Sequence, residues 1–481
     1  MPKLQFIPVN LLTRLGVVAS FNKITRDFLL NQINQRMFHD LVLVNPDNRP
    51  LKVQEDKYAL GKALISSVRN AFERGHLSKK SARGLLSVFL GNVFFGGFYR
   101  RADFVKRHGF RPPMFITISP EGACNLKCIG CYAASTPDLG KLPFHIFDQI
   151  IRDAKESWDA NFFVISGGEP LIYKSEGKSL LDIARIHSDC FFLMYTNGTV
   201  IDKKMAQKLA ELGNITPSIS VEGLEQETDE RRGKGVFKKI LTAMQNLRDA
   251  GVPFGLSITA TCKNAELIVS KEFTDFFFKQ QGAVYGWIFH YMPIGREFTL
   301  KLLPTPEQRV NLLHKIWKFV REEEIFIADF WNSGTASDGC ICAARGGGYF
   351  YIDWNGDVMP CVFIPYSTHN IVDVYKNGGN LDTVISSDLF AKIRDWQAQY
   401  GYKMPAEKID NWLCPCIIRD HHANLYEIVR ETGAHPVGED AKEALLDQTY
   451  HEGLIKYGNE IGRLTSAEWQ KEYLAPNPQK T

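Results

Sequence analysis

The apolar positions from residue 115 onward follow two alternating patterns. Short apolar runs rich in β-branched and aromatic residues occur six times, and each precedes a stretch whose apolar residues recur with helical spacing. Near-continuous apolar strands that alternate with amphipathic helices predict a parallel sheet. The runs lie at 115–119, 162–166, 191–196, 215–221, 253–259 and 284–292, and the helical stretches at 145–157, 179–187, 202–212, 236–250, 265–281 and 305–324. Six such units predict an α/β fold, a partial (β/α)6 TIM-type barrel whose reactive groups gather at the carboxyl ends of its strands.

The segments on either side of these units have other patterns. Residues 1–111 predict helices over 22–38, 57–74 and 79–99, the last interrupted by glycines. Residues 349–361 read YFYIDWNGDVMPC, two strand-like runs joined by Asn355-Gly356, which predicts a type I′ hairpin. We therefore expect four parts: a helical N-terminal region at 1–111, the barrel core at 112–325, a small α+β domain at 326–430 and a helical tail at 431–481.

Composition narrows the class of protein. Apolar residues make up 44% of the chain and charged residues 23%, which is typical of a folded soluble protein. No run approaches the ~20 apolar residues of a membrane-spanning helix, and the N-terminus lacks the features of a secretory signal. These features predict a cytoplasmic protein. Its ten cysteines then indicate metal or redox chemistry more than disulfides.

Charge is distributed unevenly along the chain. Residues 1–111 carry 19 Lys/Arg against 7 Asp/Glu, a net charge of +12, whereas the whole chain carries only +3. A basic segment in front of an acidic body indicates an anionic partner such as a lipid surface, an acidic peptide or nucleic acid. The alternative is that the basic segment docks on the acidic body of the same chain.

A first group of cysteines follows the first predicted strand. The sequence CNLKCIGCY contains Cys124, Cys128 and Cys131, which can surround one metal centre and leave one coordination position open. In a 4Fe–4S cluster, three thiolates leave one iron free for another ligand. A zinc ion with a fourth ligand from elsewhere is the alternative. The second strand runs directly into SGGEP, where two glycines allow close backbone approach and a glutamate can pair with an ammonium group.

The two motifs, in this order and spacing, resemble those of the radical S-adenosylmethionine (radical SAM) enzymes over roughly residues 115–296. The resemblance implies that Cys124, Cys128 and Cys131 hold a 4Fe–4S cluster whose open iron binds S-adenosylmethionine (SAM). It also implies reductive cleavage of SAM to a 5′-deoxyadenosyl radical, which abstracts a substrate hydrogen. An electron donor such as a ferredoxin or flavodoxin would be required, and the reaction would need anaerobic conditions.

The same resemblance assigns residues to the cofactor. Gly167, Gly168 and Glu169 would contact the amino group of SAM, Asn197 and Ser220 its ribose or carboxylate, and Arg232 its carboxylate, while YMPIGR at 291–296 resembles the loop on the adenine side. The residue before the third cysteine is usually large in this family, but here it is Gly130. We expect Tyr132, two positions on, to supply that surface.

A second group of cysteines lies outside the predicted barrel. It resembles the C-terminal auxiliary-cluster extensions of radical SAM enzymes, called SPASM or, when shortened, twitch domains. The resemblance implies a second 4Fe–4S cluster held by Cys342, Cys361, Cys414 and Cys416, with Cys340 as the alternate ligand and His421 or His422 as substitutes. Four thiolates would leave this cluster no position for a substrate, which implies a role in electron transfer. A structural zinc site with four of these cysteines is the alternative.

The sequence does not identify the substrate, and three hypotheses follow. The first is a lipid-modifying enzyme, peripherally bound to an anionic membrane through its basic N-terminal region. The second is radical oxidation or cross-linking of a peptide or protein. The third is a non-catalytic iron–sulfur electron carrier, which the intact motifs disfavour. We expect no nucleic-acid partner, and no catalytic acid or base is identified.

Overall fold

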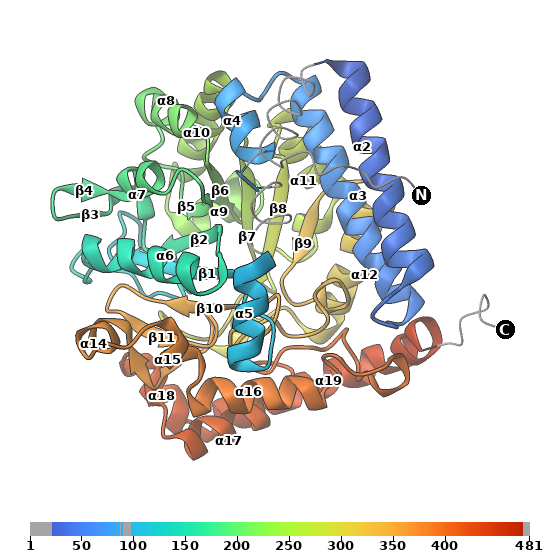
Figure 1. Ribbon diagram of the computed structural model, residues 1–481, viewed down its shortest axis with the longest axis vertical. Helices are drawn as coiled ribbons and strands as arrows, with labels where there is room; N and C mark the ends of the chain where they lie inside the picture. Colours follow the sequence, from blue (N-terminus) through green and yellow to red (C-terminus); the bar gives the residue numbers. More distant parts are fainter. Residues whose placement is uncertain (1–21, 87, 90–97, 475–481) are drawn as a thin grey trace.

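A ten-stranded sheet is the framework of the computed structural model, which describes residues 22–86, 88–89 and 98–474 (Figure 1). Its strand order is β13-β11-β10-β1-β2-β5-β6-β7-β8-β9, and all neighbours from β10 to β9 are parallel. The parallel strands are β1 (Phe115–Glu121), β2 (Phe162–Gly167), β5 (Phe191–Thr196), β6 (Ile215–Val221), β7 (Gly255–Ala260), β8 (Tyr285–His290), β9 (Ile327–Asp329) and β10 (Tyr349–Ile352). The six predicted strands are β1, β2 and β5–β8, so the partial barrel is confirmed.

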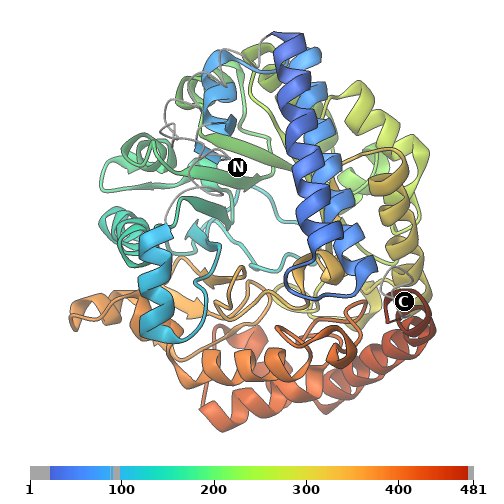
Figure 2. The same ribbon diagram turned by 45° about the vertical axis from the view of Figure 1, so that its right-hand side comes forward.

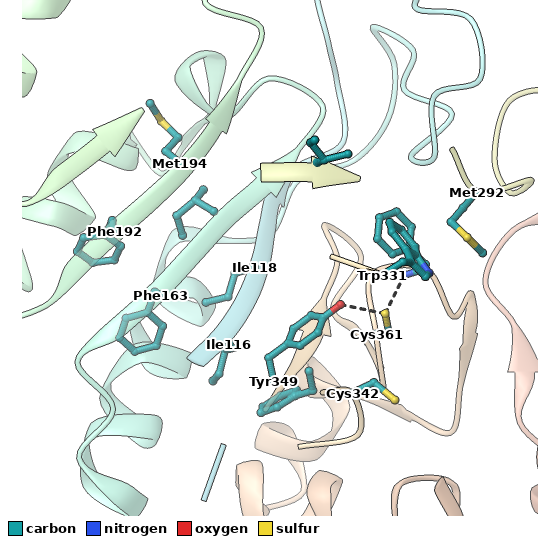
Figure 3. Packing of buried hydrophobic residues seen from close by; sticks show 14 of the residues in the cluster. Ile116, Ile118, Phe163, Phe192, Met194, Met292, Trp331, Cys342, Tyr349 and Cys361 are labelled. Carbon is teal, nitrogen blue, oxygen red and sulfur yellow. Dashed lines mark hydrogen bonds between the residues drawn. The ribbon is translucent and has the colours of Figure 1, made fainter. Parts of the chain in front are cut away.

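Helices cover the outer face of the sheet. Alternate strand residues point outward, and Ile116, Phe163 and Phe192 form a continuous apolar layer beneath the helices (Figure 3). The barrel helices are α6 (Phe144–Trp158), α7 (Leu180–Ile186), α8 (Lys203–Leu212), α9 (Glu225–Arg232), α10 (Val236–Ala250), α11 (Lys271–Thr274) with the π-helical η5 (Asp275–Gln280), and α12 (Pro306–Glu322). Short elements lie between them: η3 (Pro170–Ile172), β3 (Lys174–Ser175), β4 (Lys178–Ser179), η4 (Leu267–Val269) and η6 (Leu300–Leu302).

The predicted hairpin forms, but it belongs to the barrel sheet. Strand β10 pairs in parallel with β1, and β11 (Asp357–Met359) and β13 (His369–Asn370) extend the edge. The predicted type I′ turn is wrong, because Gly356 has φ +89° while Asn355 does not have a positive φ. Instead, the Asp353 carboxylate accepts hydrogen bonds from the Asn355 and Asp357 amides at 2.9 Å and shapes the turn.

The N-terminal region lies along one side of the barrel and across its base (Figures 1 and 2). Its elements are α2 (Lys23–Phe38), η1 (His39–Val44), α3 (Leu51–Glu73), α4 (Lys79–Arg83) and α5 (Phe98–His108). At the base, the Ser78 amide donates to the Gly251 carbonyl, just before β7. The Phe89 ring packs 5.5 Å from Phe162 and 5.2 Å from Phe191. Much of the predicted helix at 79–99 lies outside the described residues.

The C-terminal elements lie along the lower part of the molecule in Figure 2 and meet helix α3, where the Tyr473 hydroxyl donates to Asp56. They are α13 (Gly334–Ser337), β12 (Tyr366–Ser367), α14 (Ile371–Lys376), α15 (Leu381–Ile385), α16 (Asp388–Gln399), η7 (Ala406–Lys408), α17 (His422–Thr432), β14 (His435–Pro436), α18 (Glu439–Leu446), α19 (Gln448–Glu468) and η8 (Trp469–Tyr473). A fully buried ion pair of Arg309 on α12 with Asp420 joins them to the barrel. No helix in the described ranges is long and apolar enough to cross a membrane.

Candidate functional site

The first three cysteines lie on the loop after β1, at the carboxyl end of the barrel. Cys124, Cys128 and Cys131 all line the mouth of a central cavity of about 270 Å³. Burial raises the pKa of the Cys124 thiol to about 11, so its ionisation requires a compensating cation. The free Cys124 thiol is therefore protonated near pH 7, and a metal centre bound there would displace that proton.

Two glycines at the end of β2 allow the backbone to lie against the cysteine loop. The Gly168 amide donates to the Glu121 carbonyl at 2.8 Å, and the Glu169 amide donates to the Ala123 carbonyl at 2.9 Å. A Cβ atom on Gly168 would lie 2.0 Å from the Ala123 oxygen, closer than atoms can approach. Gly167 has φ +121°, a conformation that favours glycine. The two glycines thus position the loop that carries Cys124.

Glu169 joins the ends of two strands. One carboxylate oxygen accepts from the Thr196 hydroxyl at 2.8 Å and the Leu171 amide at 3.1 Å, and the other from the Asn197 amide at 2.8 Å. Burial raises the pKa of Glu169, while these donors act in the opposite direction. Its carboxylate lies behind the cavity wall, whereas Gly167 and Gly168 line the cavity directly.

The other predicted cofactor residues meet at the same mouth. Ser220, Asn197 and Arg232 line the cavity. The side-chain nitrogen of Asn197, Nδ2, lies 3.7 Å from Cys124 Sγ. Arg232 lies 3.9 Å from Cys128 Sγ. The structure therefore brings these residues and the three cysteines together.

A buried carboxylate fixes the arginines at the mouth. Glu222 accepts from Arg231 at 2.6 Å and from Arg232 Nε at 2.7 Å. Arg231 also donates to the Gly130 carbonyl at 3.2 Å, within the cysteine loop. The sequence analysis did not assign Arg231, although the two arginines are adjacent in the sequence.

The glycine before the third cysteine has a structural explanation. Gly130 has φ +61°, and a Cβ atom there would lie 2.6 Å from the ring of Tyr291. Tyr291 also lines the cavity and occupies the space that a large side chain at position 130 would need. Tyr132 extends below this point, and its hydroxyl lies 2.6 Å from Ser166 Oγ. The predicted surface is thus shared between Tyr132 and Tyr291.

The second cysteine group surrounds a separate, small cavity. Cys340, Cys342, Cys361 and Cys416 line it. Cys414, which the sequence analysis included, faces another apolar cluster and has its Sγ 3.9 Å from the Gly458 carbonyl oxygen. Cys414 and Cys416, on either side of Pro415, point in different directions, and only Cys416 faces this cavity. Cys340 is therefore the fourth cysteine of its lining, in the place predicted for Cys414.

The histidine substitutes do not face this cavity. His421 hydrogen-bonds to the Cys414 carbonyl at 2.9 Å. His422 lies between the Ile418 carbonyl and His451. The structure therefore favours a ligand set of cysteines alone.

The sulfurs of the two cysteine groups are not evenly spaced. Zinc–sulfur bonds of 2.3 Å place the sulfurs of a tetrahedral site about 3.8 Å apart. Across the described residues, only His187, Asp189 and Cys190 form a group whose ligand atoms lie within 4.8 Å of one another. Neither of the cysteine groups above meets that spacing, although Cys340 and Cys342 are 3.4 Å apart. The donor sets themselves, three thiolates at one site and four at the other, are those that iron–sulfur clusters use.

Two aromatic side chains donate hydrogen bonds to sulfurs of the second group. The Tyr349 hydroxyl lies 2.9 Å from Cys361 Sγ, and Trp331 Nε1 lies 3.1 Å from Cys416 Sγ. Figure 3 shows both aromatic residues beside Cys361. Tyr349, Phe330 and Phe363 line both cavities, so they form a shared wall between the two candidate centres.

His290 also lines the central cavity, although both of its ring nitrogens are engaged. Nε2 lies 2.7 Å from Asp329, and Nδ1 lies 2.8 Å from the buried Arg419. Burial lowers the pKa of His290 to about 4, so the ring is neutral near pH 7. This arrangement joins the barrel to the C-terminal elements and gives no indication of acid–base catalysis.

Comparison with known proteins agrees with this geometry. Residues 118–263 match the Radical SAM superfamily. The chain is 26% identical over 320 residues to the AdoMet-dependent heme synthase of Methanosarcina barkeri, covering 59% of this chain and 85% of that protein. It is 29% identical over 304 residues to the mycofactocin maturase MftC of Mycolicibacterium smegmatis, covering 60% of this chain and 74% of that protein.

A solved structure has the same fold. Streptococcus suis SuiB bound to the precursor peptide SuiA superposes with a TM-score of 0.50 at 21% sequence identity. The match covers 62% of this chain and 70% of that one. At this level of identity the similarity concerns the fold, and it agrees with the partial barrel described above.

Proposed function

Because residues 118–263 match the Radical SAM superfamily, we propose that the chain is a radical SAM enzyme that abstracts hydrogen from an apolar substrate held inside the barrel. The observation that carries this proposal is the central cavity, which begins at Cys124, Cys128 and Cys131 and continues into an apolar interior. When bound, the 4Fe–4S cluster and SAM supply a one-electron cleavage that yields the hydrogen-abstracting 5′-deoxyadenosyl radical. A ferredoxin or flavodoxin would supply the electron.

The protein's own residues would orient the cofactor and exclude water. We assign the backbone of Gly167 and Gly168, with Glu169 behind it, to the amino group of SAM. We assign Asn197 and Ser220 to its ribose or carboxylate, and Arg232 to its carboxylate, with Glu222 holding the guanidinium in place. Tyr291 and Tyr132 would cover the adenine side.

We assign the second cavity to an auxiliary 4Fe–4S cluster with four cysteine ligands. Cys340, Cys342, Cys361 and Cys416 would hold it, and Arg345 supports the loop by donating to the Cys340 carbonyl. Four thiolates leave no position for substrate, so this cluster would transfer electrons. The shared wall containing Tyr349 places it next to the substrate cavity.

A lipid at an anionic membrane surface is the substrate source that the N-terminal region supports. Helix α2 exposes Ile24 (82%), Phe28 (62%) and Ile33 (49%), and it carries the exposed cations Lys23 and Arg36. Apolar side chains beside cations on a surface helix are typical of interfacial membrane binding. The net charge of +12 over residues 1–111 favours anionic lipid.

Peptide modification is the second candidate. It is supported by the similarity to MftC of Mycolicibacterium smegmatis, which is a mycofactocin maturase. On this reading, the basic N-terminal region would bind an acidic segment of the peptide.

Two experiments test the proposal. Anaerobically reconstituted protein with SAM and a reductant should form 5′-deoxyadenosine, and Cys128→Ser should abolish it; a cluster-loaded chain that forms none would refute the proposal. Full-length protein should co-sediment with anionic liposomes, and Ile24→Glu with Phe28→Glu should weaken this binding. Leu446→Glu, at an equally exposed leucine on α18, is the matched control. Equal sedimentation of all variants would refute the membrane assignment.

A further inference from the structure

The central cavity extends along the barrel axis and is much deeper than the cysteine loop. Its lining includes Phe162, the first residue of β2, as well as Gly168, just beyond the end of that strand. Six residues of strand at 3.3 Å each span about 20 Å before strand tilt is considered. The interior of a TIM-type barrel is normally filled by layers of side chains. Here the small side chain of Ser257 at mid-height on β7 leaves space.

The chemistry of the lining changes with depth. The arginines of the lining, Arg231 and Arg232, lie at the mouth with the three cysteines, where the cofactor would bind. Below that level the lining consists mainly of apolar and aromatic side chains: Phe115, Phe162, Val164, Leu193, Trp287 and Phe330. The lower half has no charge among its lining residues. Its hydrogen-bonding groups are few: the hydroxyls of Thr117 and Ser257, and Trp287 Nε1, which is buried without a partner.

The N-terminal region closes the floor of this cavity. Ala71 at the end of α3 and Leu77 form one apolar cluster with Val164 and Leu193, and Phe72 packs against that cluster. Phe89 packs on Phe162 from the same side. The N-terminal region, whose helix α2 exposes apolar side chains, thus packs behind the residues that line the lower, apolar half of the cavity.

The shape and chemistry of this pocket select its occupant. A peptide backbone in the lower half would find too few partners for its amide and carbonyl groups, and each group left unpaired would cost about 1–3 kcal/mol. A single amino-acid side chain entering from the mouth would leave the floor empty. A hydrocarbon chain needs no hydrogen-bonding partners and gains free energy along the whole depth.

We propose that the lower half of the barrel binds the hydrocarbon chain of a membrane lipid, with its terminus toward Leu77 and Phe162. This inference rests on the proposed function, because it places the reacting carbon next to the bound cofactor. It adds the substrate class and the direction in which the chain lies.

The test uses cis-parinaric acid, a fluorescent fatty acid, as the probe for the pocket in the full-length, reconstituted protein. The unaltered protein should show saturable fluorescence enhancement. Ser257→Phe and Leu193→Trp each fill the pocket at mid-height and should weaken binding at least tenfold. Thr242→Phe, at an exposed position on α10, is the matched control and should bind like the unaltered protein.

The outcomes separate this inference from the proposed function. Thermal unfolding of each variant identifies one that fails to fold, and the second pocket variant then decides the question. Equal affinity of a folded pocket variant and the Thr242→Phe control, or absence of saturable binding, would overturn the inference. Formation of 5′-deoxyadenosine by the unaltered protein is measured in parallel. If it is absent while the probe binds, the proposed function fails and the pocket stands.

Discussion

Replacing Tyr349 with phenylalanine should lower the reduction potential of the auxiliary cluster. The Tyr349 hydroxyl lies 2.9 Å from Cys361 Sγ, and Tyr349 is 2% exposed, so water cannot readily replace the lost donor. A hydrogen bond to a ligand sulfur stabilises the more negative, reduced cluster, and its removal therefore makes reduction harder. The ring remains in the shared wall, so the substitution removes only the hydroxyl.

The size of the shift follows from the strength of one hydrogen bond. A net contribution of about 0.5–1.5 kcal/mol, expressed only in the reduced state, corresponds to about 20–60 mV for a one-electron couple. The potential is measured by redox titration of the reconstituted protein, with the cluster followed by electron paramagnetic resonance.

The same strand provides a matched control. The Tyr351 hydroxyl donates to Ser119 Oγ at 2.8 Å, inside the barrel and away from the second cysteine group. Tyr351→Phe should leave the potential of the auxiliary cluster unchanged. Equal potentials for Tyr349→Phe and the unaltered protein, or equal shifts for both variants, would refute the reasoning.

Three further predictions concern the ligand set, the glycine motif and the dependence of stability on pH. Cys340→Ser should lose the auxiliary cluster, about four of eight iron atoms, while Cys414→Ser should keep it; iron analysis showing the reverse would restore the original ligand set. Gly168→Ala should displace the Ala123 carbonyl and lower the iron content of the first cluster, and normal loading would show that the loop adapts. Burial raises the pKa of Asp353 from 3.8 to about 7. Between these two values the folded state holds a proton that the unfolded state releases. The free energy of unfolding should therefore fall by at most about 4 kcal/mol between pH 4 and pH 7. Asp353→Asn should remove this slope in chemical denaturation, and an unchanged slope would contradict the assignment.

The sequence predicted best the long apolar runs of the barrel strands and the short motifs whose reactive residues lie close together in the chain. The six barrel strands were predicted within two residues at each end, because buried parallel strands are nearly continuous apolar runs. The glycine motif could be placed against the cysteine loop because successive strand ends meet at one edge of the barrel.

The remaining features depend on contacts that no local pattern encodes. Strand β9 has only three residues, too few to show a period. Strand β10 was predicted as part of the hairpin, but its pairing with β1 spans more than 200 positions and has no local signal. Sequence spacing could not show whether Cys340 or Cys414 faces the second cavity, because the directions of the side chains around Pro415 decide it. The depth of the central cavity depends on Ser257, which has no motif around it.

The central claim is that this enzyme abstracts hydrogen from a lipid chain inside its barrel. The most direct measurement is mass spectrometry of the 5′-deoxyadenosine formed when reconstituted protein acts on anionic vesicles whose lipids carry perdeuterated chains. The account predicts 5′-deoxyadenosine that contains deuterium, with no such product from Cys128→Ser. Unlabelled 5′-deoxyadenosine from the active enzyme on these vesicles would contradict it.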